Sequence, residues 1–542
     1  MLKSALSLFL FSLLTLEPLN PSTLKPFKLA PNYAVAAEPD ARLKEAEEHL
    51  EAWRLAPAEQ IVSRLLSEIP QSPDALDLKG RIAFYRGSYE EAVRFSEQAL
   101  KFASANERAN AFRLFAQRTQ DTVKALKRFE SPHFILYLDG ERDSILAPQA
   151  LATLESSYHA IGKSLGYLPR EKVRVEIAPD AASFNAISTL SLRDIEETGA
   201  VGICKFNKIM TISPRALLQG YRWLDSLSHE FLHYAIVSLS DNKAPIWLHE
   251  GMARFYETRW LSAAGSGGAE DYLTPSNRTL LARALAQNKF VGFDKMEPSL
   301  IYLETPEQVQ LAYAEAASAV DFLASRKGEA GVRELLSEVA KRPTTRDAIE
   351  TVLGIPFAAF EREWKAFLKV KGLKEIEGSR VRKLRVKGNQ KEDEEAVELR
   401  EIQSVVARNR THLADQLLDK GRKAAAAKEY ERALQASPQS PIILGKLARA
   451  LIQTDRHEEA LAHLKKAQAL DPDSVGTYIQ LGRLYHSKKD FPNARIALEE
   501  AIQINPFNPT IYRPLSEAYA ALGDQDNAKK SRVTLERLMT PK

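Results

Sequence analysis

The chain has 542 residues, too many for one compact core, and its length predicts roughly three or four domains. Its 75 Lys and Arg residues against 71 Asp and Glu residues leave a formal net charge of +4, so we expect no nucleic-acid partner and no anionic membrane surface. The single cysteine, Cys204, excludes an intramolecular disulfide framework and metal sites built from several thiolates. Any metal must therefore be bound by His and carboxylate side chains.

The N-terminus has the composition of a secretory signal. Lys3 precedes an apolar run from Ala5 to Leu16, and small residues suited to cleavage occupy 34–37. We therefore predict a signal peptide over residues 1–37 and an exported protein, periplasmic or secreted if bacterial. A cytosolic protein with an apolar start is the alternative. No later run of 18 apolar residues occurs, so no integral membrane span is expected after signal removal.

Residues 38–129 are predicted to be helical. Gly80, Ala92 and Ala99 follow one another at intervals of 12 and 7 residues, which place small side chains where two paired helices cross. The stretch from Leu43 to Ile69 could form a diverged helix pair beside them. So few helix pairs must pack against the next domain to bury their apolar faces.

Residues 130–370 are predicted to form a separate α+β domain. β-rich runs occupy His133–Leu138 and Val173–Ile177, and a helical stretch, Leu146–Leu165, separates them. Gly202–Ile212 is predicted to be a hairpin with its turn near Asn207–Lys208, and the strand near Asn207–Ile212 is predicted to lie at an edge of the sheet. The pattern after Pro214 is helical almost to residue 370. A small sheet followed by many helices is typical of an α+β domain.

The first helix after the hairpin contains the pattern His-Glu-x-x-His. Positions i and i+4 lie on one helix face, so His229 and His233 can both bind a single Zn²⁺. Glu230 lies about 100° round the helix and can reach a water on that metal, which makes it the candidate general base. An inert helix with a salt-bridged or hydrogen-bonded His-Glu-x-x-His stripe is the alternative.

A catalytic zinc site requires a third protein ligand and an open position. Glu250 is the natural candidate, because the 16-residue spacer after His233 lets the chain reverse and present the first turn of a second helix. Gly251 and Ala253 are expected to let these two helices approach closely. We therefore predict one zinc ion per chain, bound by His229, His233 and Glu250.

The pair of motifs H-E-x-x-H and W-L-x-E-G-x-A resembles the gluzincin metallopeptidases. Together with the hairpin and the later segment around Tyr313, it looks most like the peptidase-MA-like domains found beside tetratricopeptide repeats in exported bacterial proteins. The resemblance implies that His229, His233 and Glu250 bind zinc and that Glu230 is catalytic. Aminopeptidases of this type have a Glu, in a strand upstream of the H-E-x-x-H motif, that binds the free amine of the substrate. The corresponding strand here has no such Glu, so an aminopeptidase is not supported.

Residues around the motifs have several candidate roles. Tyr313 could donate to the oxyanion, although an aromatic at helical spacing is more often part of the core. Asp225 and Glu257 are candidates to orient the ligands, because Arg254 occupies the position where some gluzincins have an acid. His249 is expected to be a partly exposed helix residue.

The remaining chain contains a charged segment and a repeat. Residues 371–406 are predicted to be a charged linker, since 16 of the 30 residues in 371–400 are charged. Prolines then recur every 34 residues, at 438, 472 and 506, and small residues recur in register with them at 426, 460 and 494. Residues 407–542 therefore resemble tetratricopeptide repeats, and the 38–129 region resembles a weaker copy.

These features predict a multidomain, mainly α-helical protein in which tetratricopeptide solenoids flank an α+β gluzincin-like domain. The predicted function is an exported zinc-dependent metallopeptidase, an endopeptidase acting on a protein or peptide, whose repeats bind a protein partner or the substrate. One alternative is a non-catalytic tetratricopeptide scaffold of the cell envelope with a degenerate or structural metal domain. Hydrolysis of a non-peptide amide by the same site is another.

Overall fold

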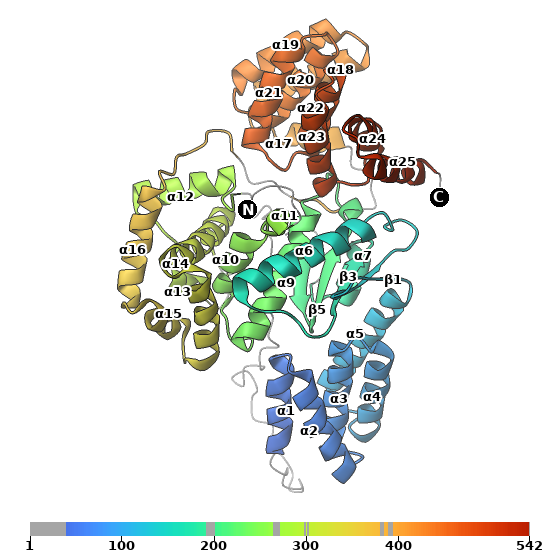
Figure 1. The fold of residues 1–542 in the computed structure, drawn as a ribbon, viewed down its shortest axis with the longest axis vertical. Helices are drawn as coiled ribbons and strands as arrows, with labels where there is room; N and C mark the ends of the chain where they lie inside the picture. Colours follow the sequence, from blue (N-terminus) through green and yellow to red (C-terminus); the bar gives the residue numbers. More distant parts are fainter. Residues whose placement is uncertain are drawn as a thin grey trace, which may run out of the picture.

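The computed structural model describes residues 40–190, 201–263, 271–297, 300, 303–379, 384–387 and 394–540. The predicted signal peptide, residues 1–37, lies outside these described residues. N-terminal helices, a central domain with a sheet, and C-terminal helices follow one another along the long axis (Figure 1). Within the described residues, no helix is both long and apolar enough to cross a bilayer.

The N-terminal helices form two antiparallel pairs and a closing helix, which we call the N-terminal array. They are α1 (Ala41–Glu51), α2 (Leu55–Glu68), α3 (Pro73–Tyr85), α4 (Tyr89–Phe102) and α5 (Glu107–Lys124). A Cβ atom at Gly80 would lie 3.1 Å from the carbonyl oxygen of Ala92, so glycine lets α3 and α4 cross closely. The small-residue spacing therefore predicted this crossing correctly.

A five-stranded sheet in the order β1-β2-β3-β5-β4 is the centre of the molecule. Its strands are β1 (Lys127–Glu130), β2 (Phe134–Leu138), β3 (Val173–Ala178), β4 (Gly202–Lys205) and β5 (Lys208–Ile212). β2, β3 and β5 are parallel, whereas β1 and β4 run antiparallel at the two edges. The sheet starts at Lys127, before the predicted boundary at residue 130.

The predicted hairpin is present, but two of its details differ from the prediction. Phe206 and Asn207 have φ of 57° and 59° and form the tight turn, one residue earlier than expected. β5 lies between β3 and β4, so the prediction that Asn207–Ile212 forms an edge strand was wrong. β4 is the edge strand, because β5 uses its other side to pair with β3.

The two faces of the sheet have different partners. Helices α6 (Ala147–Leu165) and α9 (Trp223–Ser240) pack on one face, where Phe134 of β2 meets Phe231 of α9 at a ring separation of 5.2 Å. The N-terminal array reaches the other face. There Lys208 Nζ lies 2.8 Å from both Glu176 Oε2 and Tyr89 Oη, and Glu176 and Lys208 are 0% and 1% exposed. The array therefore completes the core of the central domain.

Almost all of the chain between Pro214 and residue 370 that the structure describes is helical or in short connections, as predicted. The elements besides α9 are η2 (Pro214–Ala216), α10 (Ile246–Tyr256), α11 (Trp260–Ala263), α12 (Pro275–Gln287), α13 (Phe293–Met296), α14 (Pro306–Lys341), α15 (Thr345–Leu353) and α16 (Phe357–Val370); α7 (Ala181–Ile187) precedes the hairpin. A Cβ atom at Gly251 would lie 2.6 Å from the carbonyl oxygen of Ala316. Gly251 thus allows α10 to approach α14, and not α9 as expected.

The described parts of the charged segment lie against the central domain. Val386 forms an antiparallel bridge with Leu217, and Lys387 N donates to Ala216 O at 2.7 Å. Thr279 of α12 bonds Ser379 at 2.9 Å through the two hydroxyl groups. A short helix, α17 (Glu394–Glu401), then leads to the C-terminal helices. This charged segment is therefore partly fixed by contacts and is not a free tether over its described residues.

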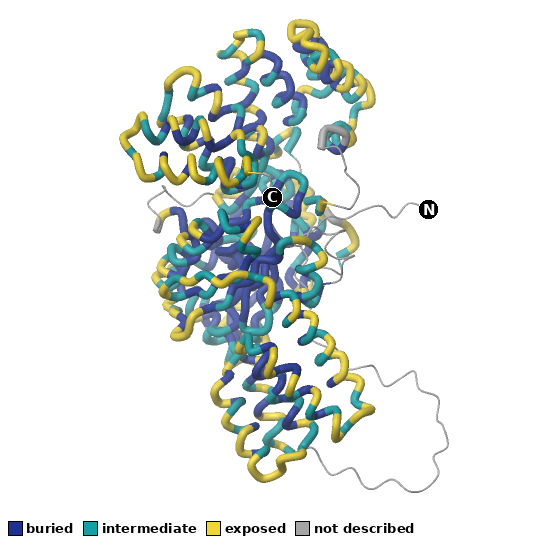
Figure 2. Tube along the Cα trace, turned by 90° about the vertical axis from the view of Figure 1, so that its right-hand side faces the viewer, coloured by how far each residue is buried: buried dark blue, intermediate teal, exposed yellow. Residues whose placement is uncertain are grey.

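The C-terminal helices form antiparallel pairs, which we call the C-terminal array. They are α18 (Val405–Asp419), α19 (Lys423–Ala436), α20 (Pro441–Ile452), α21 (His457–Leu470), α22 (Val475–Ser487), α23 (Phe491–Ile504), η4 (Pro509–Ile511), α24 (Tyr512–Ala521) and α25 (Gln525–Met539). Ala426, Ala460 and Ala494 are all 0% exposed, as the repeat predicts. Buried residues fill the central domain and line the contacts between paired helices (Figure 2). The predicted multidomain, mainly helical fold is confirmed.

Candidate metal centre

Helix α9 brings the two histidines of the His-Glu-x-x-His pattern to one place. The helix is buried on most of its surface between the sheet, α6, α10 and α14. It ends where Asp241 adopts a left-handed conformation with φ 51°. His229 and His233 are 7% and 4% exposed, and their rings lie 4.7 Å apart. The four-residue spacing therefore places both imidazoles on the same buried face.

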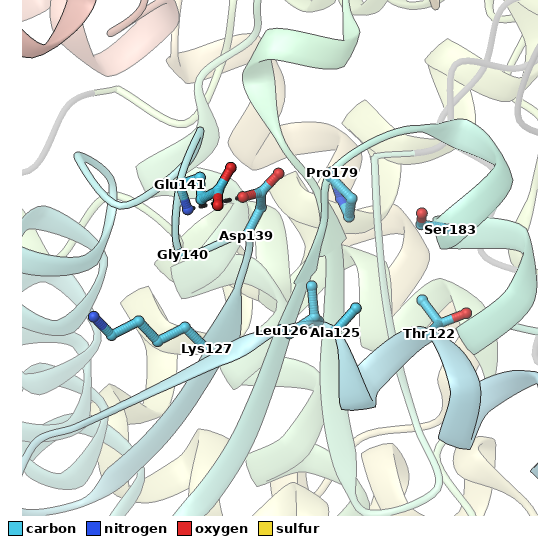
Figure 3. Close-up of a pocket in the computed structure, with 9 residues that line it drawn as sticks. All are labelled: Thr122, Ala125, Leu126, Lys127, Asp139, Gly140, Glu141, Pro179 and Ser183. Atoms are coloured by element: carbon cyan, nitrogen blue, oxygen red, sulfur yellow. Dashed lines mark hydrogen bonds between the residues drawn. The ribbon is translucent and has the colours of Figure 1, made fainter. Parts of the chain in front are cut away.

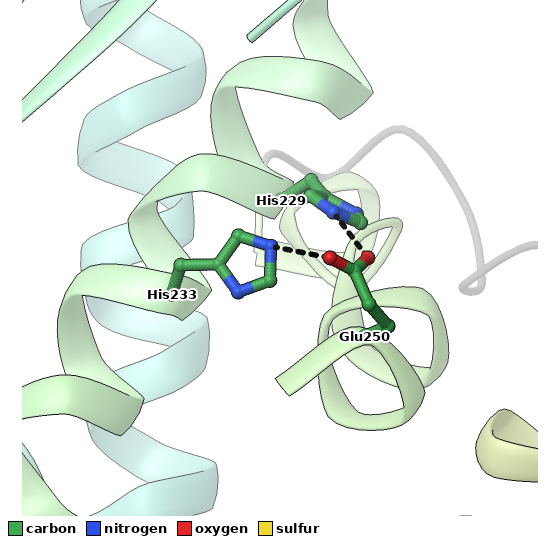
Figure 4. A group of neighbouring side chains, drawn as sticks. All are labelled: His229, His233 and Glu250. Carbon is green, nitrogen blue, oxygen red and sulfur yellow. Dashed lines mark ion pairs between the residues drawn. The ribbon is translucent and has the colours of Figure 1, made fainter. Parts of the chain in front are cut away.

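Glu250 comes from the first part of α10, which follows the turn after α9. Its Oε2 lies 3.5 Å from His229 Nε2, and its Oε1 lies 3.7 Å from His233 Nε2 (Figure 4). One ligand atom from each of the three residues lies within 4.8 Å of the others. The structure thus brings together the three residues that the sequence predicts to be metal ligands.

These three side chains fit a zinc ion. Two imidazole nitrogens and one carboxylate form a donor set typical of catalytic zinc sites, which leave one position open. Glu250 Oε1 is buried and has no hydrogen-bond partner among the described residues. A bound cation would satisfy this oxygen, which is otherwise costly to bury. Metal binding itself stays a prediction.

Glu230 lies beside the three candidate ligands and against the edge of the sheet. The side chain is 1% exposed, and a Cβ atom built at Gly202 of β4 would meet the Glu230 carboxylate. A larger residue at position 202 would force this carboxylate to move. Burial, with a contribution from the charge of Glu250, raises the pKa of Glu230 well above its usual value. Without a cation nearby, burial therefore favours the neutral form of this carboxyl group.

Glu257 orients His229 from the far side of the imidazole. Its Oε2 lies 2.8 Å from His229 Nδ1, which directs the other nitrogen, Nε2, toward Glu250. Arg254 donates from Nη1 to Glu257 Oε1 at 2.8 Å and fixes this carboxylate in turn. Asp225, the other candidate for such a role, instead accepts from Trp260 Nε1 at 2.8 Å. The structure therefore favours Glu257 over Asp225 for orienting a ligand.

His249 is a residue whose place the sequence did not predict. It was expected to be partly exposed, but it is 1% exposed, and its Nδ1 lies 3.3 Å from His233 Nδ1. Burial lowers the pKa of His249 to about 4, so the ring is neutral and can orient His233. Its position directly before Glu250 was a signal, but the direction of the side chain depends on how α10 packs.

The charges around the candidate ligands are strongly coupled. Burial disfavours a charged His229, but the carboxylates of Glu250 and Glu257 outweigh burial and raise its pKa to about 10. Burial and the charge on His229 lower the pKa of His233 well below its usual value. In the metal-free chain one proton therefore sits among these groups, where a divalent cation would supply the positive charge instead.

Tyr313 lies on α14, the helix that packs against α10. It is 6% exposed, and burial, followed by the charge of Glu250, raises its pKa well above the usual value. The tyrosine is thus within the electrostatic reach of Glu250. Its predicted role as a donor to an oxyanion stays a prediction.

A separate pocket of about 500 Å³ lies where α5, β1 and the ends of β2 and β3 meet (Figure 3). Its polar lining includes Asp139, Glu141 and Ser183. Asp139 already accepts from the backbone N–H groups of Glu141 and Arg142, at 2.9 Å and 3.0 Å. None of the candidate metal ligands lines this pocket.

Comparison with protein families matches two parts of the chain. Residues 186–370 match the Peptidase MA superfamily. Tetratricopeptide-repeat models match residues 417–484 and 475–508. The first match contains α9 and α10 with all of the candidate ligands, and the others fall within the C-terminal array.

Similar individual proteins match a minor part of this chain. The small glutamine-rich tetratricopeptide repeat-containing protein 2 of Mycosarcoma maydis is 27% identical over 131 residues, 23% of this chain and 37% of that protein. The protein STIP1 homolog of Dictyostelium discoideum is 29% identical over 105 residues, 19% of each chain. The chain thus spans well under two thirds of either relative.

Solved structures are also similar to part of the chain. MamA protein is 24% identical, with a TM-score of 0.23, over 24% of this chain and 72% of that chain. A thermophilic TPR protein of Thermus thermophilus is 29% identical, with a TM-score of 0.23, over 24% of this chain and 74% of that chain. The chain thus contains a Peptidase MA superfamily domain, matched over residues 186–370, followed by tetratricopeptide repeats, matched over residues 417–508.

Proposed function

We propose that the protein is a zinc-dependent peptidase of the gluzincin type that cleaves internal bonds of a protein or peptide. The observation that carries this proposal is the convergence of His229, His233 and Glu250, with the Glu230 carboxylate beside them. A purely structural zinc site needs no general base and usually has four protein ligands. The buried Glu230, which no structural site would require, therefore favours an enzyme.

In this proposal three side chains bind the metal and a fourth transfers the proton. Zinc held by His229, His233 and Glu250 would supply Lewis acidity, which lowers the pKa of a water molecule and polarises a substrate carbonyl. The Glu230 carboxylate accepts the proton of the attacking water and then donates it to the nitrogen of the leaving amine. Because burial raises the pKa of Glu230, its carboxylate is a stronger base, which favours the first proton transfer.

The position of β4 supports an extended substrate. β4 is an edge strand of the sheet, and Gly202 within it touches the Glu230 carboxylate. An extended peptide that paired with this edge would place its backbone carbonyl groups beside the general base. We therefore place the substrate at β4 and not at β5. Hydrolysis of a non-peptide amide would use the same groups.

The repeats extend this proposal to protein partners. Tetratricopeptide repeats form protein–protein contacts, and the C-terminal array follows the peptidase domain directly after the charged segment. We propose that this array binds a protein partner or the substrate. Export through the predicted signal peptide at residues 1–37 is part of the same proposal, and it would place the activity outside the cytoplasm.

Substitution of the general base tests the proposal. The Glu230→Gln chain should bind zinc as the wild type does, because residue 230 is not a ligand. It should cleave peptides at least about a thousandfold more slowly, because a carboxamide cannot accept the proton. The measurement is cleavage of an unbiased peptide library by mass spectrometry, with zinc content determined on the same samples.

The His233→Ala chain is the companion variant, because it should lose both zinc and hydrolysis. If wild type and Glu230→Gln cleaved the library at equal rates, the assignment of Glu230 would be wrong. If zinc-loaded wild type cleaved nothing in the library, a non-catalytic repeat scaffold would replace the peptidase.

A further inference from the structure

The first residues of α9 are fixed to the C-terminal array by backbone acceptors. Trp223, the first residue of the helix, donates from Nε1 to Ile502 O at 3.1 Å. Tyr221 N donates to Ile504 O at 2.9 Å. Both acceptors lie in the last turn of α23, where helix carbonyl groups have no partner within the helix. Each hydrogen bond therefore satisfies a group that would otherwise be buried without a partner.

Gly220 and the partly buried cation of Arg222 belong to the same contact. Gly220 has φ 73°, and a Cβ atom there would lie 2.2 Å from Ile504 O, so only glycine permits the approach. Arg222 Nε contacts Asp473 Oδ1 at 2.9 Å, and its Nη2 contacts Glu500 Oε2 at 3.2 Å. We call this contact between residues 220–223 and the C-terminal array the C-terminal joint.

The C-terminal half of α9 and the turn that follows it contact the N-terminal array. The rings of Trp53 and Tyr234 lie 5.3 Å apart, and Tyr234 directly follows His233. At the end of the helix, Arg54 Nη1 contacts Asp241 Oδ1 at 2.6 Å. Asn242 Nδ2 then donates to the carbonyl oxygen of Glu51 at 3.1 Å. The loop between α1 and α2 therefore holds this end of the helix.

We infer that the two repeat arrays position the helix that carries the candidate metal ligands, with Gly220 and Trp223 as positioning residues. His229 follows Trp223 by six residues, or about 9 Å along the helix axis. His229 and His233 must meet Glu250, which belongs to another helix, with errors of less than about 0.5 Å. A shift of α9 along its axis or about it would separate these side chains. The arrays therefore contribute to the site as well as to partner binding.

The variant Trp223→Phe tests this inference in the full-length chain. It keeps most of the buried ring but leaves Ile502 O without its donor. Apparent zinc affinity, measured by competition with a chelator, should fall about three- to tenfold. Deuterium exchange of the backbone amides in α9 should rise in the metal-free chain. Gly220→Ala changes no residue of α9, but its Cβ atom would push Ile504 O away. It should change both measurements in the same direction.

Trp364→Phe is the matched control. Trp364 is as buried as Trp223, at 1% exposure, and donates from Nε1 to Ser318 Oγ at 3.0 Å, but it lies on α16 and not on α9 or α10. This variant should leave zinc affinity within about twofold of wild type and α9 exchange unchanged. Equal effects of Trp223→Phe and Trp364→Phe on both measurements would overturn the inference.

The zinc measurement rests on the proposed function, but the exchange measurement does not. If the wild type bound no zinc, the proposed peptidase function would be wrong. Deuterium exchange of the α9 backbone amides would still decide whether the C-terminal joint positions the helix. If the wild type bound zinc but Trp223→Phe and Gly220→Ala behaved like the control, the proposed peptidase function would be retained. The positioning role of the arrays would then be rejected.

Discussion

Glu257 illustrates how residues that do not bind the metal can decide the geometry of the centre. Its carboxylate occupies the Nδ1 side of His229 and leaves Nε2 directed at Glu250. Burial alone would raise the pKa of Glu257, but Arg254 and His229 outweigh burial and lower it. The carboxylate is therefore ionised and strengthens the basicity of a neutral, metal-binding imidazole.

Substitution of Glu257 gives a prediction at the residue scale. In Glu257→Gln, a carboxamide oxygen can still accept from Nδ1, but it lacks the charge that raises the basicity of the ring. Zinc affinity should fall about tenfold or more. Glu155→Gln is the matched control, because Glu155 makes a similar contact with His133 Nδ1 at 2.6 Å, and His133 is not one of the candidate metal ligands. An equal loss in both variants would contradict the role given to Glu257.

Sequence spacing predicted the candidate ligands but not the residues that orient them. His229, His233 and Glu250 follow from helix periodicity and from one turn of suitable length, which are local properties. Asp225 and Glu257 were equal candidates, because each lies on a helix near a ligand. The choice of Glu257, and the burial of His249, depend on how α9 and α10 pack, which is set by contacts distant in sequence.

At the scale of elements, the hairpin and the sheet order differ in how far they could be predicted. β-rich runs on both sides of a short turn identified the hairpin. The assignment of β5 as the edge failed, because the pairing of β3 with β5 joins Arg174 to Lys208 across a long connection that no local pattern records. The same limit explains Gly251, whose close neighbour is Ala316 in a helix much later in the chain.

The contact between the sheet and the N-terminal array depends on a buried ion pair. Burial alone would raise the pKa of Glu176, but the charges of Lys208 and Arg174 outweigh burial and lower it to about 2. Burial also lowers the pKa of Lys208 to about 8, which leaves the amine protonated at neutral pH. The pair is therefore charged under ordinary conditions, and Tyr89 of the array adds a hydrogen bond to it.

This pair predicts an acid-sensitive contact. A carboxyl pKa of about 2 in the folded chain, against 4.5 for the ordinary group, contributes about 3 kcal/mol to the free energy of unfolding above pH 4.5. This contribution should be lost as the pH falls from 4.5 to 2. Glu176→Gln should lower stability by about 3 kcal/mol at pH 7 and less at pH 2.

Urea denaturation followed by tryptophan fluorescence at several pH values measures this difference. Tyr89→Phe is the control, because it removes one hydrogen bond to Glu176 but keeps the ion pair. It should cost about 1 kcal/mol with a much weaker dependence on pH. A difference between wild type and Glu176→Gln that stayed constant from pH 7 to pH 2 would contradict the assigned charge state.

At the scale of the whole molecule, the repeats were visible in the sequence, but the docking of the C-terminal array on the central domain was not. A period of 34 residues identifies the C-terminal helices, because each repeat needs the same small residues at its helix crossings. Trp223 and Ile502 are 279 residues apart, and nothing in either local sequence indicates that they meet. Contact of the N-terminal array with the next domain was therefore expected, because so few helix pairs cannot bury their apolar faces alone, whereas contact of the C-terminal array with α9 was not.

The zinc content of the purified full-length chain tests the account most directly. Elemental analysis after removal of loosely bound metal should find about one zinc per chain in the wild type and in Glu230→Gln. His233→Ala and Glu250→Ala should contain almost none, because each loses one of the three ligands. A wild-type chain that holds no stoichiometric metal, or a Glu250→Ala chain that holds as much as the wild type, would contradict the proposed centre.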